Sequence, residues 1–202
     1  MEINFIAENT IELNKELSIL DKLALSAFPI VEKHAKYVIM SGYVAILFGR
    51  SRVSEDIDAF IERISYEKFC QISGELQKAG FWFVNSSDDK ELFSMLEDDI
   101  AIRIAEHGKA IPNIEIKFPS EDLDFYTLDN PFAVFVNGKT LLVSKIEQQI
   151  AYKFHLGTEK DMEDAVYLYE IFKEQLNIDM LREYGNKLNV LTAMKKEGVL
   201  HG

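Results

Sequence analysis

The feature that most constrains this chain is a pair of aspartates two residues apart at the start of a β-prone run, Asp56-Ile57-Asp58-Ala59-Phe60-Ile61. In a strand, residues i and i+2 point to the same face, so Asp56 and Asp58 are expected to project their carboxylates side by side. Two such carboxylates repel each other, and a divalent cation removes that cost. Because both ligands are hard oxygens, Mg²⁺ or Mn²⁺ is favoured over softer metals. The pattern predicts a strand that carries a metal-binding pair.

A glycine turn comes before the aspartates. Tyr37–Met40 is a short β-prone run, Ser41-Gly42 interrupts it, and Tyr43–Phe48 suits a short helix. A glycine at the start of a helix lets a phosphate approach the backbone N–H groups, where the helix dipole favours negative charge. Gly42 could act in this way, with the N–H of Tyr43 among the donors, or it could be a plain turn residue.

A basic loop joins this helix to the aspartate strand. Arg50 and Arg52 could pair with a phosphate or with the acidic end of the strand. They could also be surface charges that Glu55 neutralises.

The predicted secondary structure changes at about residue 143, from mixed strands and helices to helices alone. Before that point, the leucine spacing between Glu8 and Lys36 predicts a helix, which Pro29 could break or kink. Asn137-Gly138 between two β-prone runs predicts a hairpin. After that point, three stretches predict helices: Lys145–Leu156, Lys160–Glu174 and Asp179–Lys196. The predicted organisation is an α/β domain over residues 1–143 and a helical C-terminal segment over residues 144–202.

The segment Gly49-Arg50-Ser51-Arg52-Val53-Ser54-Glu55-Asp56-Ile57-Asp58 is similar to the signature of the nucleotidyltransferase superfamily. It matches the minimal form Gly-Arg-x-Arg-x-(Thr/Ser)-x-Asp-(Ile/Leu)-Asp. Over about residues 37–170 the chain resembles the abortive-infection type IV toxin nucleotidyltransferases and uncharacterised bacterial and archaeal relatives. The resemblance implies an α/β (α+β) fold with a mixed sheet flanked by helices. It also implies transfer of a nucleoside monophosphate from an NTP to an acceptor hydroxyl, with release of pyrophosphate.

The resemblance also implies roles for single residues. A third carboxylate is expected on a later strand, and Glu115 within Asn113–Phe118 is the candidate, as the base for the acceptor or as a ligand of a second metal. The family usually has aspartate there. Lys153 would reach the nucleotide phosphates, and the acids of Asp161–Asp164 would hold helices in register or touch the substrate. The catalytic and metal-binding candidates are Asp56, Asp58 and Glu115, and the nucleotide-binding candidates are Ser41, Gly42, Tyr43, Arg52, Ser54 and Lys153.

Plainer interpretations remain for these residues. The aspartate pair could be a solvated strand entrance, and Glu115 could be an edge-strand carboxylate facing water. Lys153 could extend its amine to solvent, and acids at Asp161–Asp164 are favoured by any helix start. The usual turn is Gly-Ser or Gly-Gly, whereas this chain has Gly42-Tyr43 and so lacks a serine hydroxyl. The alternatives to an active transferase are a catalytically inactive nucleotide- or partner-binding module on this fold and an interaction protein without nucleotide affinity.

Charge and composition limit the partners. The 202 residues include 22 Lys and Arg against 34 Asp and Glu, a net charge of -12, which argues against a large non-specific nucleic-acid-binding face. A single cysteine excludes an internal disulfide and a Cys-rich zinc site. The N-terminus does not resemble a signal peptide, and no apolar run approaches the roughly 20 residues that span a bilayer. We expect a cytoplasmic protein with no membrane contact. Its expected partners are an NTP, an acceptor and, by the resemblance, a cognate antitoxin.

Overall fold

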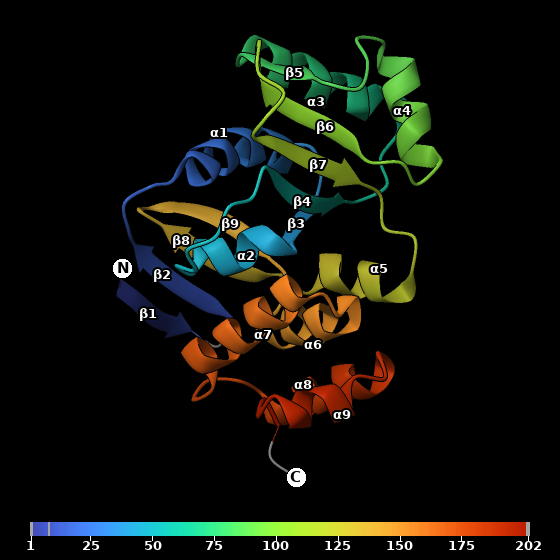
Figure 1. The fold of residues 1–202 in the computed structure, drawn as a ribbon. Coiled ribbons are helices and arrows are strands. Elements are labelled where there is room, and N and C mark those ends of the chain that lie inside the picture. Colours follow the sequence, from blue (N-terminus) through green and yellow to red (C-terminus); the bar gives the residue numbers. More distant parts are fainter. Residues whose placement is uncertain (1, 8, 201–202) are drawn as a thin grey trace.

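The computed structural model describes residues 2–7 and 9–200, and within them a nine-stranded mixed sheet is flanked by helices (Figure 1). The strands lie in the order β1-β2-β8-β9-β3-β4-β7-β6-β5. Their bounds are β1 Glu2–Ala7, β2 Thr10–Asn14, β3 Tyr37–Met40, β4 Asp56–Ile61, β5 Phe81–Phe83, β6 Ile102–Glu106, β7 Asn113–Lys117, β8 Phe132–Val136 and β9 Lys139–Val143. The helices are α1 Ile19–Glu32, α2 Gly42–Leu47, α3 Tyr66–Lys78, α4 Asp89–Glu97, α5 Asp122–Asp129, α6 Ile146–Leu156, α7 Glu159–Phe172, α8 Ile178–Lys187 and α9 Leu191–Lys196.

The beginning of the chain differs most from the sequence prediction. Residues 10–14 form a strand that pairs in parallel with β8, so the prediction of a helix there is wrong. Ile11 and Leu13 are fully buried while their neighbours are more exposed, which is the two-residue period of a strand. The predicted helix starts at Glu8, which lies outside the described residues. The same is true of Met1 and of residues 201–202, which are the outer ends of the two predicted domains. Helix α1 begins only after Ser18, whose side chain caps it, and it continues through Pro29.

The centre of the sheet has two chemically different faces. Residues of β4, β6 and β7 that alternate along the strands are buried in the main core: Ile57, Ala59, Ile61, Ile102, Ile104, Ile114 and Ile116. Helix α1 packs on β3, β4 and α3. The intervening residues point to the opposite face, where α5 covers one end through Leu128 packed with Val38 and Phe60. This second face carries the polar residues of β4 and β7.

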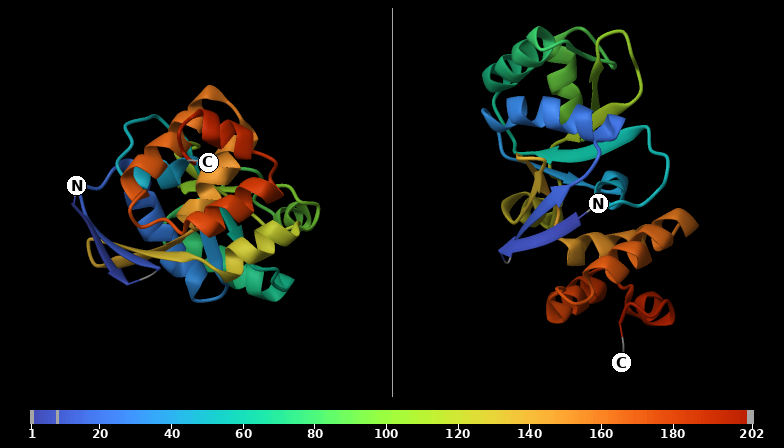
Figure 2. Two further views of the ribbon diagram at one scale, coloured as in Figure 1. Left: turned by 90° about the horizontal axis from the view of Figure 1, so that it is seen from below. Right: turned by 90° about the vertical axis from the view of Figure 1, so that its left-hand side faces the viewer.

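Helices α6 to α9 follow the last hairpin. The hairpin prediction is confirmed, because β8 and β9 pair antiparallel around Asn137 and Gly138, both with positive φ. The stretch predicted as one last helix forms two, α8 and α9, separated near Asn189, which also has a positive φ. Helix α6 packs on α7, α8 and α9, and α7 also packs on α2. Helices α8 and α9 lie at the opposite end of the molecule from α3 and α4 (Figures 1 and 2).

A membrane-spanning segment was also sought. Within the described ranges, no helix has both the length and the apolar character needed to cross a bilayer.

Candidate functional site

Asp56 and Asp58 lie on the polar face of the sheet at the start of β4. Both are partly buried, and the intervening Ile57 points into the core. Asp58 is in register with Met40 on β3 and with Glu115 on β7, and Glu115 is in register with Arg103 on β6. Because in-register residues share a face, one row across four strands carries two carboxylates and a guanidinium.

A pocket of about 400 Å³ opens over this row. Ser41, Asp58 and Glu115 line it, together with Lys117, which lies two residues after Glu115 on the same strand. Tyr152 of α6 lines it from the helical side. The fold thus brings three of the sequence-predicted residues to a single pocket between the sheet and the first C-terminal helix.

Burial sets the electrostatics of Asp58. Its pKa is raised to about 6, chiefly by burial and then by the negative charges of Asp56 and Glu115. A hydrogen bond with the Ser41 side chain and the charge of Lys153 act in the opposite direction. The carboxyl group is therefore held among like charges, an arrangement in which a bound cation would lower its pKa.

The third carboxylate has a cationic partner within the protein. Arg103 Nε donates to Glu115 Oε1 over 2.7 Å. Within residues 2–7 and 9–200, no group of three or more His, Cys, Asp or Glu side chains is arranged to hold a metal ion. The hard oxygens of Asp56 and Asp58 fit Mg²⁺ or Mn²⁺ chemically. Glu115 would join them through Oε2, the oxygen that Arg103 Nε does not contact.

The turn before α2 has an unusual backbone. Ser41 has φ 63° and ψ -138°, a conformation that is costly for a residue with a side chain. Gln149 of α6 fixes this peptide, because its Nε2 donates to the Ser41 carbonyl over 2.5 Å, and Ser144 Oγ donates to Gln149 Oε1 over 2.8 Å. Gly42 packs closely on the basic loop, since a Cβ at this position would overlap the Arg52 guanidinium and displace it.

Three cations surround Asp164, which is completely buried on α7. Arg50 Nη1 and Arg52 Nη1 each donate to one of its carboxylate oxygens, and Lys153 Nζ lies 3.0 Å from Oδ2. Lys153 also donates to Asp161 over 2.6 Å. Burial lowers the pKa of Lys153, and the hydrogen bond to Asp161 opposes that shift. This Asp164 cluster joins the basic loop to the C-terminal helices.

The same loop also reaches the first aspartate. Arg52 Nη2 donates to Ser54 Oγ over 3.3 Å, and Ser54 Oγ donates to Asp56 Oδ1 over 3.0 Å. The ion pairs of the two loop arginines run to α7, and Glu55 is not among them. The Lys153 side chain is 2% exposed, so its amine does not extend to solvent.

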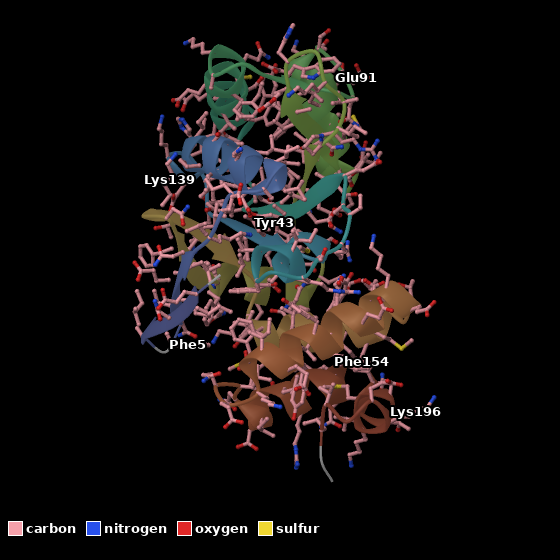
Figure 3. The ribbon with its side chains drawn as sticks, turned by 60° about the vertical axis from the view of Figure 1, so that its left-hand side comes forward. Phe5, Tyr43, Glu91, Lys139, Phe154 and Lys196 are labelled. Atoms are coloured by element: carbon pink, nitrogen blue, oxygen red, sulfur yellow. The ribbon has the colours of Figure 1, made fainter. Side chains whose placement is uncertain are left out.

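The Tyr43 side chain is buried in the core and does not line the pocket, and Figure 3 shows its place in the interior of the molecule. Its hydroxyl donates to Asp21 Oδ1 over 2.8 Å. Asp21 is itself buried, and its other oxygen pairs with Lys15 over 2.9 Å and accepts the Ser18 backbone N–H. Any contact of Tyr43 with a nucleotide is therefore left to its backbone N–H.

Replacing Tyr43 with phenylalanine is expected to lower the free energy of unfolding by about 1–3 kcal/mol, because a buried carboxylate loses a donor. Urea denaturation monitored by circular dichroism measures the loss. Tyr167→Phe is the matched control, since the Tyr167 hydroxyl donates over 3.2 Å to the Phe48 carbonyl at a partly exposed place. Equal stability of Tyr43→Phe and the wild type would contradict the role given to this hydrogen bond.

Three buried side-chain atoms in the described ranges have no hydrogen-bond partner: Arg52 Nε, Asn113 Oδ1 and Gln148 Oε1. Two of the three lie beside the aspartate pair, and the third lies over the same face of the sheet. Arg52 contacts Ser54, Asn113 is the in-register partner of Asp56, and Gln148 lines a small pocket that adjoins the larger one. Buried polar groups are rarely left unpaired, so their gathering here marks a place that is built to meet polar ligands.

Sequence reasoning missed the contribution of α6 other than Lys153. Gln148, Gln149 and Tyr152 all face the sheet from this helix. Two adjacent glutamines after Glu147, between the buried Ile146 and Ile150, were a usable signal, because buried amides need specific partners. Asn113 could not be found in this way, since only the pairing of β4 with β7 places it beside Asp56.

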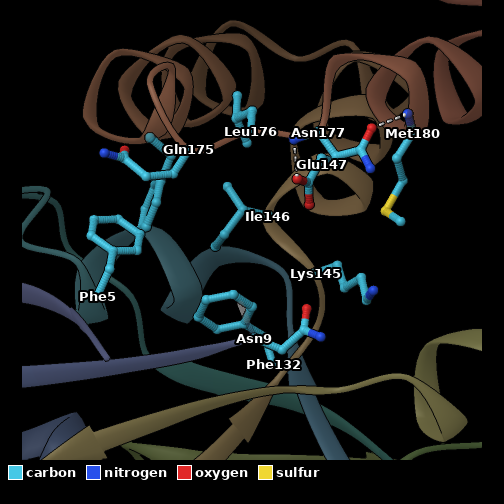
Figure 4. Close-up of a pocket in the computed structure, with 11 residues that line it drawn as sticks. Phe5, Asn9, Phe132, Lys145, Ile146, Glu147, Gln175, Leu176, Asn177 and Met180 are labelled. Carbon is cyan, nitrogen blue, oxygen red and sulfur yellow. Dashed lines mark hydrogen bonds between the residues drawn. The ribbon is translucent and has the colours of Figure 1, made fainter. Parts of the chain in front are cut away.

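A separate pocket of about 270 Å³ lies between the β1–β2 end of the sheet and helices α6 to α8 (Figure 4). Phe5 and Phe132 contribute apolar walls. Its one carboxylate, Glu147, accepts the Asn177 backbone N–H over 2.8 Å and so stabilises the start of α8. This pocket lacks the paired acids of the first, and we assign the chemistry to the site on the polar sheet face.

The architecture is similar to that of solved proteins. No family model matches the chain, and no curated protein matches it in sequence. An antigenic nucleotidyltransferase-like protein from Paracoccidioides brasiliensis superposes with a TM-score of 0.52 at 16% identity, over 87% of this chain and 90% of its own. JHP933 from Helicobacter pylori superposes with a TM-score of 0.44 at 16% identity, over 82% of this chain and 72% of its own. The first superposition identifies a nucleotidyltransferase-like fold, a mixed sheet flanked by helices, as the sequence predicted.

Proposed function

We propose that this protein is a metal-dependent nucleotidyltransferase that moves a nucleoside monophosphate from an NTP to an acceptor hydroxyl on RNA, protein or a small molecule. One observation carries the proposal: Asp58 and Glu115 are in register on adjacent strands and line the same pocket of about 400 Å³. Asp56 adds a second carboxylate two residues before Asp58 on the same face. The nucleotidyltransferase-like fold supports this interpretation.

Asp56 and Asp58 would hold Mg²⁺ or Mn²⁺, which when bound neutralises negative charge on the transferring phosphate and on the leaving group. Glu115 would accept the proton of the acceptor hydroxyl. The hydroxyl oxygen forms a bond to the α-phosphorus, the bond from the α-phosphorus to the bridging oxygen of the β-phosphate breaks, and pyrophosphate leaves. Because Arg103 Nε donates to Glu115 Oε1, the other carboxylate oxygen, Oε2, would accept this proton.

The triphosphate would lie between the turn and the basic loop. Ser41 offers a hydroxyl, and Arg52 Nε is a buried donor that still needs an acceptor. The Arg52 guanidinium lies against Gly42, so a phosphate bound at the turn would lie beside this cation. Lys153 is held by Asp161 and Asp164, so we assign it a positioning role for the loop together with a long-range positive charge.

The test is transfer itself. Purified protein incubated with Mg²⁺ or Mn²⁺ and each α-labelled NTP is expected to label an acceptor in total RNA, in cell protein or in a small-molecule fraction. The double variant Asp56→Asn/Asp58→Asn should lose the labelling. Glu55→Gln, which removes an exposed carboxylate beside the pair, should retain it. Equal labelling by the double variant and the wild type would contradict the proposal.

The ion pair between Arg103 and Glu115 favours a second candidate, a nucleotide- or partner-binding module without catalysis. Calorimetric binding of an NTP with no transfer to any acceptor fraction would identify it. The similarity of residues 49–58 to toxin nucleotidyltransferases also supports a place in a toxin–antitoxin pair. In that case, expression of the wild type should arrest growth and expression of Asp56→Asn/Asp58→Asn should not.

A further inference from the structure

We propose that this site prefers nucleotides whose base carries an exocyclic amino group at the edge far from the sugar, adenine or cytosine, and that Gln148 Oε1 reads this group. The inference rests on the proposed function, because it names the NTP that the same site takes. It begins from a small pocket next to the carboxylates.

The small pocket adjoins the large one. Its volume is about 60 Å³, and Met40, Lys117 and Tyr152 line both. Gln148 lies one helical turn before Tyr152 on α6, so the two side chains point in similar directions from the helix. A group that extends from the large pocket past Tyr152 therefore meets Gln148.

The orientation of the Gln148 amide is fixed by its neighbour. Thr127 Oγ1 donates its single proton to the Leu123 carbonyl over 2.6 Å. It can therefore only accept from Gln148, and Nε2 is the atom that donates to it. The remaining atom, Oε1, has no hydrogen-bond partner in the described part of the chain, although Gln148 is only 7% exposed. A buried acceptor of this kind favours a ligand that brings an N–H.

The volume and the lining of the small pocket limit which bases can bind there. A volume of about 60 Å³ is too small for an aromatic ring but accepts an amino group, so the ring itself would lie in the pocket of about 400 Å³ beside Tyr152. Adenine and cytosine present an amine at their far edge. Guanine and uracil present a carbonyl oxygen at the corresponding position. That oxygen would face Gln148 Oε1 and the carboxylate of Asp124, which also lines the small pocket, so the two keto bases are disfavoured.

The experiment measures affinity and not turnover. Dissociation constants of the four α,β-methylene NTPs with Mg²⁺ are determined by isothermal titration calorimetry. For the wild type we expect the adenine or cytosine analogue to bind about 5- to 50-fold more tightly than the guanine and uracil analogues. In Gln148→Leu this ratio should fall below about threefold, because the amino-base analogue loses its acceptor and the keto bases no longer face Gln148 Oε1.

The outcomes separate this inference from the proposed function. If no analogue binds the wild type, the nucleotidyltransferase proposal fails. If all four bind the wild type equally, or if Gln148→Leu keeps the preference, only the role of Gln148 fails. Gln148→Met, which is closer in shape to glutamine, provides the same comparison should the leucine variant not fold. Gln149→Leu would be an unsuitable control, because Gln149 donates to the Ser41 carbonyl and its loss would change the turn of the same site.

Discussion

Replacing Asp164 with alanine is expected to lower the free energy of unfolding by about 3–5 kcal/mol, the usual cost of breaking a buried ion pair by removing one of its partners. Asp164 is fully buried and is the shared partner of Arg50, Arg52 and Lys153. The side chains of these three cations are 15%, 10% and 2% exposed, so water cannot replace the carboxylate. Chemical denaturation at constant ionic strength measures the loss.

Glu163→Ala is the matched control for this substitution. Glu163 is the neighbouring acid and also accepts from Arg50, over 2.5 Å, but its side chain is 59% exposed. Its removal should cost less than about 1 kcal/mol. Adding Arg52→Met to Asp164→Ala should recover part of the stability, because the ion pair of Arg52 in the described ranges is with Asp164, so one uncompensated cation is removed. Similar losses for Asp164→Ala and Glu163→Ala would show that burial does not govern this cluster.

Asp58→Asn is expected to affect stability and transfer in opposite directions. In the folded protein the pKa of Asp58 is about 6, above its ordinary value of 3.8. The folded state therefore binds this proton more tightly than the unfolded chain, and without divalent cations the contribution of Asp58 to the free energy of unfolding falls as the pH rises from about 4 to about 6. The shift corresponds to about 2–3 kcal/mol. At neutral pH the metal-free asparagine variant should be more stable than the wild type by up to this amount.

The same variant should transfer nucleotides at least about a hundredfold more slowly, because a bound cation contributes several kcal/mol to the stabilisation of the transition state. Thermal unfolding across the pH range with and without Mg²⁺ checks the stability part. Mg²⁺ should raise the unfolding temperature of the wild type and leave Asp58→Asn unchanged. Without metal, a stability difference between Asp58→Asn and the wild type that does not grow between about pH 4 and pH 6 would contradict the raised pKa of Asp58.

The local pattern around the aspartates carried most of the fold prediction. Residues 56–61 alternate acid and apolar side chains, so their strand and its two faces could be read directly. The hairpin could also be predicted from a local signal. Asn and Gly are the residues that adopt a positive φ most readily, and Asn137 and Gly138 both do so in the turn. Residues 10–14 were read as helix because the leucines that follow have helical spacing. Strand β2 has the two-residue alternation of buried and exposed side chains over only five residues, and its pairing with β8 stabilises it.

The site depends more on long-range pairing, and there the sequence was less informative. The strand spacing predicted that Asp56 and Asp58 share a face, but no sequence pattern indicates that Arg103 pairs with Glu115. That contact requires β6 and β7 to be neighbours in a particular register. The same holds for Asp164. Its position at a helix start explains an acid there, whereas its burial among three cations follows from the packing of α7 against α2.

The Gln149 hydrogen bond to the Ser41 carbonyl has a practical meaning for anyone who divides this chain into pieces. Secondary structure changes character at about residue 143, which invites an expression boundary there. A fragment ending at that point would keep all three candidate carboxylates. It would also lose the amide that holds the turn and the acid that neutralises the basic loop. The helical C-terminal segment supplies residues that position the turn and the basic loop of the candidate site. A boundary at about residue 143 would therefore separate the candidate carboxylates from those residues.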